Sequence, residues 1–136
     1  MATFSAITPS TVHVPPSFSY SQAVRMGDLI FVAGQVAENA KGELVGKDDI
    51  RAQTVQVFEN LRLVLEAAGS GLDLVGKVTV LTTSLAHRLA IHEVRSEVFG
   101  PSGHYPASTL AVITSLAKPE FLVEIDAIAL ARAAAG

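Results

Sequence analysis

The sequence predicts an α+β domain, and three observations support this fold class. Two stretches repeat apolar residues every three or four positions, as helices with one buried face do. Four short runs are apolar almost throughout, which is typical of strands covered on both faces. These elements follow one another as strands, helix, strand, helix and two strands, with no internal repeat or linker. All 136 residues are therefore interpreted as one domain.

Both helices have recognisable ends. The first is predicted to start at Asp48 or Asp49, whose carboxylate can accept hydrogen bonds from the backbone N–H groups of the first turn. Gly69 is expected to end it, because glycine readily adopts the left-handed conformation that closes many helices. The second helix is predicted over residues 86–99, where a Gly-Pro pair stops it. The apolar face of the first helix consists of Ile50, Thr54, Val57, Phe58, Leu61, Leu65 and Ala68.

The strands are predicted at residues 29–33, 77–83, 109–116 and 121–130. We expect residues 118–120 to join the last two strands as a hairpin, residues 38–43 to form a turn around Gly42, and residues 15–21 to be irregular. Two helices can cover only one face of this sheet. Because 49% of the residues are hydrophobic and only 17% are charged, we expect copies of the chain to cover the other face in an oligomer.

Composition also excludes several kinds of function. The sequence has no cysteine, which rules out disulfides and thiolate nucleophiles, and none of its four histidines pairs at the i, i+4 spacing of a helical metal site, so no metal is expected. A net charge of −3 with scattered basic residues disfavours nucleic-acid binding. Neither a phosphate-binding loop nor a nucleophile elbow is present. Without a membrane span or a visible signal peptide, a cytoplasmic location is the expectation.

The last apolar run contains two carboxylates, Glu124 and Asp126. In a strand these side chains point to the same face, because side chains alternate. An ionised carboxylate buried without a partner is costly, so the face is either open or supplied with partners. The pattern leaves two interpretations open: a site of proton transfer in a cleft, or a strand with one solvated face.

Several short segments occur in a characteristic order: 20–24, 27–36, 42–46, 52–69, 77–80, 98–100, 105–107 and 123–129. Together they resemble the Rid family of reactive intermediate deaminases, also called the liver perchloric-acid-soluble or translation-inhibitor family, over residues 17–130. The resemblance implies a chorismate-mutase-like mixed sheet with two helices on one face. It also implies a homotrimer with an inner barrel and with clefts between neighbouring subunits.

The resemblance further implies a chemistry. In active members the substrate is a 2-imino or 2-enamino acid released by enzymes that use pyridoxal phosphate. Water is added and ammonia leaves, giving a 2-oxo acid without any cofactor. The family's pocket tyrosine matches Tyr20, and its strand-end catalytic glutamate matches Glu124. The glycine of its Ser-Gly-Gln motif matches Gly34, but Ala33 replaces the serine.

The sequence departs most from the family's pattern at the position of the carboxylate-binding arginine, where it has Ser108. Thr109 follows, and a shift of one residue still brings no arginine to this position. His92 falls where some members have an asparagine. The sequence therefore resembles arginine-lacking members of the family.

Three hypotheses follow from this comparison. In the first, the intersubunit cleft binds a small polar metabolite, and Glu124 directs water or a proton in the reaction. In the second, the chain is a 2-imino acid deaminase in which another cation, such as Arg25 or Arg95 of a neighbour, replaces the arginine. In the third, the chain is a non-catalytic interaction or chaperone-like module. The first hypothesis gives the ligand-binding residues as Tyr20, Ala33, Gly34, His92, Ser108 and Thr109.

Overall fold

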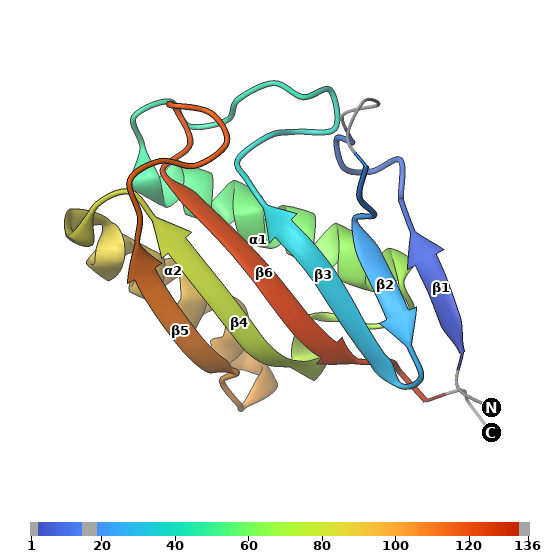
Figure 1. Cartoon of the computed structure of the whole chain (residues 1–136). Helices are drawn as coiled ribbons and strands as arrows, with labels where there is room; N and C mark the ends of the chain where they lie inside the picture. The colour runs from blue at the N-terminus through green and yellow to red at the C-terminus, as the bar shows by residue number, and fades with distance from the viewer. Residues whose placement is uncertain (1–2, 15–18, 134–136) are drawn as a thin grey trace.

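A computed structural model describes residues 3–14 and 19–133. Its centre is a six-stranded mixed sheet with the strand order β1-β2-β3-β6-β4-β5, and both long helices lie on the same face of that sheet (Figure 1). The strands are β1 (Phe4–Ile7), β2 (Ala23–Met26), β3 (Leu29–Gln35), β4 (Val75–Thr82), β5 (Ala107–Val112) and β6 (Val123–Leu130). The helices are α1 (Ile50–Ala67) and α2 (Arg88–Phe99), with single 3-10 turns at Leu72–Leu74, Leu85–His87 and Gly100–Ser102.

The helix ends agree closely with the predictions. The carboxylate of Asp49 caps α1 by accepting a hydrogen bond of 3.0 Å from the backbone N–H of Ala52. Gly69 follows the helix with a φ of +79°, as expected for a glycine that closes a helix. The α-helical part of α2 starts two residues later than predicted, because a 3-10 turn capped by the Ser84 hydroxyl precedes it.

The sheet topology corrects two predictions. The hairpin predicted at residues 118–120 is wrong: β6 lies between β3 and β4 and is antiparallel to both, whereas β5 pairs in parallel with β4. The short strands β1 and β2 were not predicted, because four residues give too little alternation to detect. Of the irregular segment 15–21, residues 15–18 lie outside the described residues, and Ser19 to Ser21 form no strand.

Alternation along β6 separates the core from the other face of the sheet. Val123, Ile125, Ala127 and Ala129 are buried under the helices, where Phe58 of α1 meets Phe99 of α2 edge to face at 5.6 Å. Strand β5 is mostly exposed, so the prediction that it is covered on both faces does not hold within one chain. It is an edge strand, in which Ser108 contacts Arg95 of α2 and Leu110 packs against the core.

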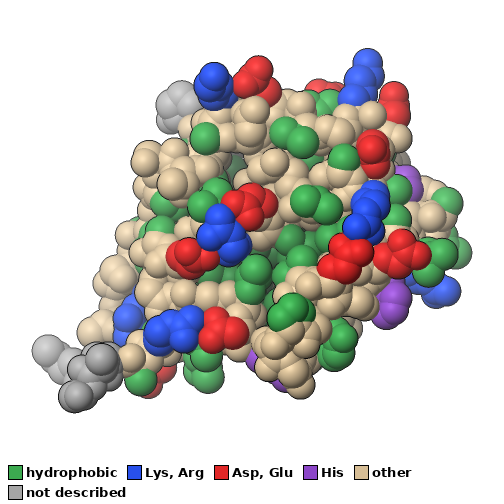
Figure 2. Space-filling view, turned by 180° about the vertical axis from the view of Figure 1, so that it is seen from behind, with side chains coloured by type: hydrophobic (Ala, Val, Ile, Leu, Met, Phe, Trp, Pro, Cys, Tyr) green, Lys and Arg blue, Asp and Glu red, His purple; other side chains and the backbone are tan. Residues whose placement is uncertain are grey.

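The face without helices remains uncovered in the single chain, as predicted. Strand pairing aligns a row of apolar side chains across this face, and they are substantially exposed: Phe4, Met26, Leu29, Phe31 and Leu130. On the opposite, helical face, Lys and Arg side chains lie beside Asp and Glu (Figure 2). Among the described residues, no helix combines the length and hydrophobicity that crossing a membrane requires.

Candidate functional site

Glu124 lies on the uncovered face of the sheet, beside an irregularity in β3. Val32 pairs with Ala127 and Gln35 with Ile125, so two residues of β3, Ala33 and Gly34, stand opposite one residue of β6. Such a bulge changes the direction of side chains at a strand and often occurs next to active sites.

Gly34 makes room for the carboxylate of Glu124. A Cβ atom at position 34 would lie only 2.6 Å from both Cδ and Oε2 of Glu124. Atoms that are not bonded do not approach this closely, so any larger residue at position 34 would displace the acid. The predicted residues Gly34 and Glu124 are therefore in direct contact, and Ala33 is next to them in the bulge.

Two effects raise the pKa of Glu124. The larger cause is burial, which disfavours the charged carboxylate, and the second is the negative charge of Asp126 on the same face of β6. Asp126 itself is exposed and accepts a hydrogen bond of 3.2 Å from the backbone N–H of Thr79. A raised pKa is typical of a carboxylate that exchanges protons with a ligand.

Tyr20 belongs to the same group of residues. Burial raises the pKa of its phenol, and the charges of Glu38 and Glu124 raise it further. Glu38 is nearly buried at its side chain, with 11% exposed, and pairs with Lys118 at 3.3 Å. Sequence reasoning missed Glu38, because an acid within a polar turn carries no signal of its own.

Buried amides hold the backbone around this group. Gln35 donates to the side chain of Gln22 at 2.7 Å and to the carbonyl of Ala33 at 3.0 Å. Asn60 of α1 donates to the carbonyls of Val36 and Glu38, each at 2.9 Å. A site supported in this way keeps its geometry, because its neighbours cannot move independently.

A small polar cavity of about 30 Å³ adjoins Gly34. It is lined by His13, Tyr20, Gln22, Gly34, Gln35, Val36, Glu38 and Asn60. This volume is sufficient for one water molecule, and the lining offers it several polar partners.

The remaining predicted residues lie elsewhere in the chain. Ser108 pairs with the buried Val78 and so faces the helices, where its hydroxyl accepts a hydrogen bond of 2.8 Å from Arg95 Nη1. His92 is exposed on α2 and shares a cavity with Arg95. Thr109 faces the other way, and its hydroxyl accepts a hydrogen bond of 2.6 Å from Lys77 Nζ.

The predicted site therefore divides into separate parts. Tyr20, Ala33, Gly34 and Glu124 come together where β3 ends and β6 begins. His92 and Ser108 come together at α2 and β5, on the helical side of the sheet, and the intervening strand β4 separates them from Glu124. Within one chain these two parts do not form one site.

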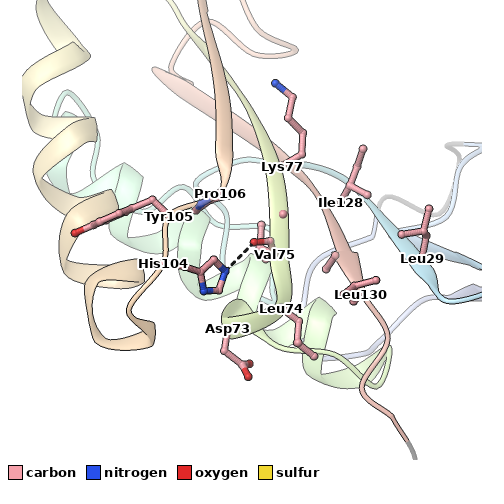
Figure 3. Close-up of a pocket in the computed structure, with 12 residues that line it drawn as sticks. Leu29, Asp73, Leu74, Val75, Lys77, His104, Tyr105, Pro106, Ile128 and Leu130 are labelled. Carbon is pink, nitrogen blue, oxygen red and sulfur yellow. Dashed lines mark hydrogen bonds between the residues drawn. The ribbon is translucent and has the colours of Figure 1, made fainter.

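A larger open groove of about 540 Å³ contains none of the predicted residues. It lies where β4 begins, and Figure 3 shows the ring of His104 beside Val75, where His104 Nε2 donates a hydrogen bond of 3.3 Å to the Val75 carbonyl. Leu29, Ile128 and Leu130 supply much of its lining. These are residues of the uncovered apolar face, so the groove is a continuation of that face.

Comparison with known proteins agrees with the fold. Residues 11–131 match the family model described as endoribonuclease L-PSP. A RutC family protein of Pyrococcus horikoshii is 44% identical over 115 residues, which cover 84% of this chain and 88% of that protein. A protein of Dermatophagoides farinae named 2-iminobutanoate/2-iminopropanoate deaminase is 31% identical over 113 residues, covering 83% and 86%.

A solved structure extends this agreement to three dimensions. The crystal structure of RidA from an Antarctic Psychrobacter species superimposes with a TM-score of 0.84 and 31% identity, and the match covers 93% of this chain and 98% of that one. The family model spans most of the chain, and the solved structure has the same fold. The chain therefore belongs to the Rid family, whose members also carry the names RutC, YjgF and L-PSP.

Proposed function

We propose that the protein hydrolyses the C=N bond of a small 2-imino acid, or of its 2-enamino tautomer, in clefts between copies of the chain. The observation that carries this proposal is the position of Glu124, whose carboxylate lies against Gly34 with a raised pKa. A relative bearing the name of an iminoacid deaminase supports the choice of substrate. The reaction needs no cofactor, since water is the only second reactant.

The reaction follows from the properties of one carboxylate. Ionised Glu124 accepts a proton from a water molecule while the water oxygen bonds to the imine carbon, and Glu124 then passes this proton to the nitrogen, which gives a neutral carbinolamine. When the carbinolamine collapses, Glu124 carries the hydroxyl proton to the nitrogen, the C=O bond forms, the C–N bond breaks, ammonia leaves and the carboxylate is regenerated. A carboxylate with a raised pKa suits this role, because it accepts a proton near neutral pH more readily than an ordinary glutamate. Gly34, which contacts Glu124, also lines a small polar cavity with room for one water molecule.

A shared cleft between copies explains why the predicted residues divide into two parts. Glu124 and Tyr20 belong to one part, and His92 and Ser108 belong to the other, which β4 keeps on the far side of the sheet. If a second copy covers the exposed apolar face, one part of each chain can lie opposite the other part of its neighbour. We infer a homotrimer, as the resemblance to the Rid family implies, with three such clefts.

The proposal is tested by measuring ammonia release from freshly generated 2-iminopropanoate or 2-iminobutanoate. Glu124→Gln is expected to lower the rate about 10²- to 10⁴-fold, because amide groups do not accept the proton. Asp126→Asn is the matched control on the same face of β6. It should keep the rate and shift the acidic limb of the pH–rate profile to lower pH, since Asp126 helps to raise the pKa of Glu124.

If the native protein gave no acceleration over buffer, beside an active relative, the proposal would be wrong. Binding of a small polar metabolite without reaction would then be the surviving hypothesis. The name of the family model refers to ribonuclease activity, but a net charge of −3 disfavours binding to the phosphates of RNA. We therefore do not assign that activity to this chain.

A further inference from the structure

The arginines of the described residues fall into two groups. Four of them form ion pairs with carboxylates: Arg25, Arg51, Arg62 and Arg132. The other two, Arg88 and Arg95, have no carboxylate partner within the part of the chain that the structure describes, and both belong to α2. On a chain with a net charge of −3, two neighbouring arginines without an acid are an exception that needs a reason.

The charges of α2 are sorted onto two sides of the helix. At 3.6 residues per turn, positions 88, 92 and 95 fall within about 60° of one another. Glu93 and Glu97 point the other way, toward Arg51 of α1: Glu97 pairs with it at 2.8 Å, and the charge of Glu93 helps to raise its pKa. The acids of α2 are therefore unable to neutralise the basic side of the same helix.

The basic side of α2 lines a cavity of about 290 Å³, whose lining residues are Arg88, Leu89, His92 and Arg95. Ser108 of β5 holds Arg95 in place through the hydrogen bond of 2.8 Å from Nη1. A guanidinium has five N–H donors, so this contact leaves the others available for a ligand. Holding the group also reduces the side-chain entropy that is lost when a ligand binds.

The start of α2 strengthens the positive potential of this cavity. Arg88 is the first residue of the helix, where unpaired backbone N–H groups carry a partial positive charge. The first turn contains no acidic residue, and no side chain caps it. Two guanidinium groups, a histidine and this helix end together favour an anion, and an arginine fork matches the two oxygens of a carboxylate.

We propose that Arg95, held by Ser108 and assisted by Arg88, binds the carboxylate of the substrate. This inference rests on the proposed function, in which Glu124 reaches the same cleft from a neighbouring copy. Ser108 occupies the position where the resemblance led us to expect the carboxylate-binding arginine. The chain keeps the cation at that position but supplies it from α2 instead of from β5. Arg25 differs from Arg95, because its guanidinium already faces the carboxylate of Asp28 at 3.9 Å and donates to the carbonyl of Gly27 at 2.9 Å.

The test is calorimetric titration of the native protein with pyruvate, with neutral pyruvamide and with inorganic phosphate. Pyruvate should bind, and pyruvamide should bind much more weakly because it lacks the charge. Arg95→Ala should weaken pyruvate binding about 10- to 100-fold, the range for one lost charged hydrogen-bonding group. Arg95→Lys should recover only part of this loss. The control variant Lys47→Ala, which removes an exposed charge elsewhere, should bind pyruvate with the native dissociation constant. Alanine is a good helix former, so the Arg95 variant is expected to fold.

Each result separates this inference from the proposed function. Equal pyruvate binding by the native protein and by Arg95→Ala, or tighter binding of phosphate than of pyruvate, would overturn the carboxylate subsite. Glu124→Gln should bind pyruvate at least as tightly as the native protein does, since it removes a negative charge from the cleft and leaves the anchor intact. If Arg95→Ala loses pyruvate while the native protein hydrolyses no imine, the subsite stands and the proposed reaction fails. If Arg95→Ala hydrolyses the imine with the native KM, the subsite is wrong and the reaction stands.

Discussion

Gly34→Ala tests whether close contact with β3 positions the proposed catalytic carboxylate. The new Cβ would lie 2.6 Å from Cδ and Oε2 of Glu124, whereas ordinary contact begins at 3.4 Å, so the carboxylate must move by about 0.8 Å. A displacement of about 1 Å in a catalytic group can lower the rate about 10²-fold, which corresponds to roughly 2.7 kcal/mol. The change in stability should stay within about 1 kcal/mol, because Gly34 does not have a positive φ and alanine suits a strand at least as well.

Two measurements check this prediction, and one variant controls for it. Ammonia release reports the rate, and carbon-13 NMR titration of the Glu124 carboxyl reports its pKa, which should fall as the displaced group gains water. Gly76→Ala is the matched control, since this glycine of β4 has nothing within 4 Å of an added Cβ. If Gly34→Ala kept both the native rate and the native pKa of Glu124, the contact with β3 would not position the acid.

Three further predictions concern stability and assembly. Because burial raises the pKa of Glu124, the folded chain binds the proton of this carboxyl group more tightly than the unfolded chain does, and stability falls as pH rises through the raised pKa. Thermal melting should therefore show that Glu124→Gln is more stable than the native protein at neutral pH. Below the ordinary pKa of glutamate the two proteins should be equally stable. Asn60→Ala should cost about 1–3 kcal/mol in denaturant titrations, because the carbonyl of Glu38 loses its side-chain donor and the carbonyl of Val36 keeps only the backbone N–H of Glu38. Light scattering should find a trimer that Phe31→Glu weakens, and a monomeric native protein would contradict the shared cleft.

Much of the fold was predictable because local physics determines it. The start of α1 at Asp49 and its end at Gly69 depend on hydrogen bonds and dihedral angles within a few residues, so both appear in the sequence. The position of β6 does not have this property. Adjacent strands in the chain usually pair, which suggested a hairpin, but β6 instead inserts between β3 and β4. The position of β6 depends on burial between residues that are far apart in the chain. The alternation of apolar residues within one strand does not show which strands will lie beside it.

Some residues of the candidate site could be identified from the sequence, but their arrangement could not. Gly34 and Glu124 were both identified, but their contact depends on a bulge in β3 that the residue pattern does not predict. Arg95 shows the opposite case. Its spacing from Arg88 and His92 was visible in the sequence, but the meaning of that spacing depends on which acids of α2 turn toward α1 and on the hydroxyl of Ser108. Side chains that are unpaired become evident only when their possible partners have been placed.

Glu124 and Asp126 show how two acids on one face of one strand acquire different properties. Alternation places both on the uncovered face of β6, and up to this point they are equivalent. The bulge then places Gly34 against Glu124, so this carboxylate is partly buried, while Asp126 stays exposed and accepts from the backbone of Thr79. The exposed acid still affects the buried one, because its charge helps to raise the pKa of Glu124. A strand with one solvated face is therefore compatible with the proposed site of proton transfer, since the charge of the exposed acid helps to raise the pKa of the partly buried acid beside it.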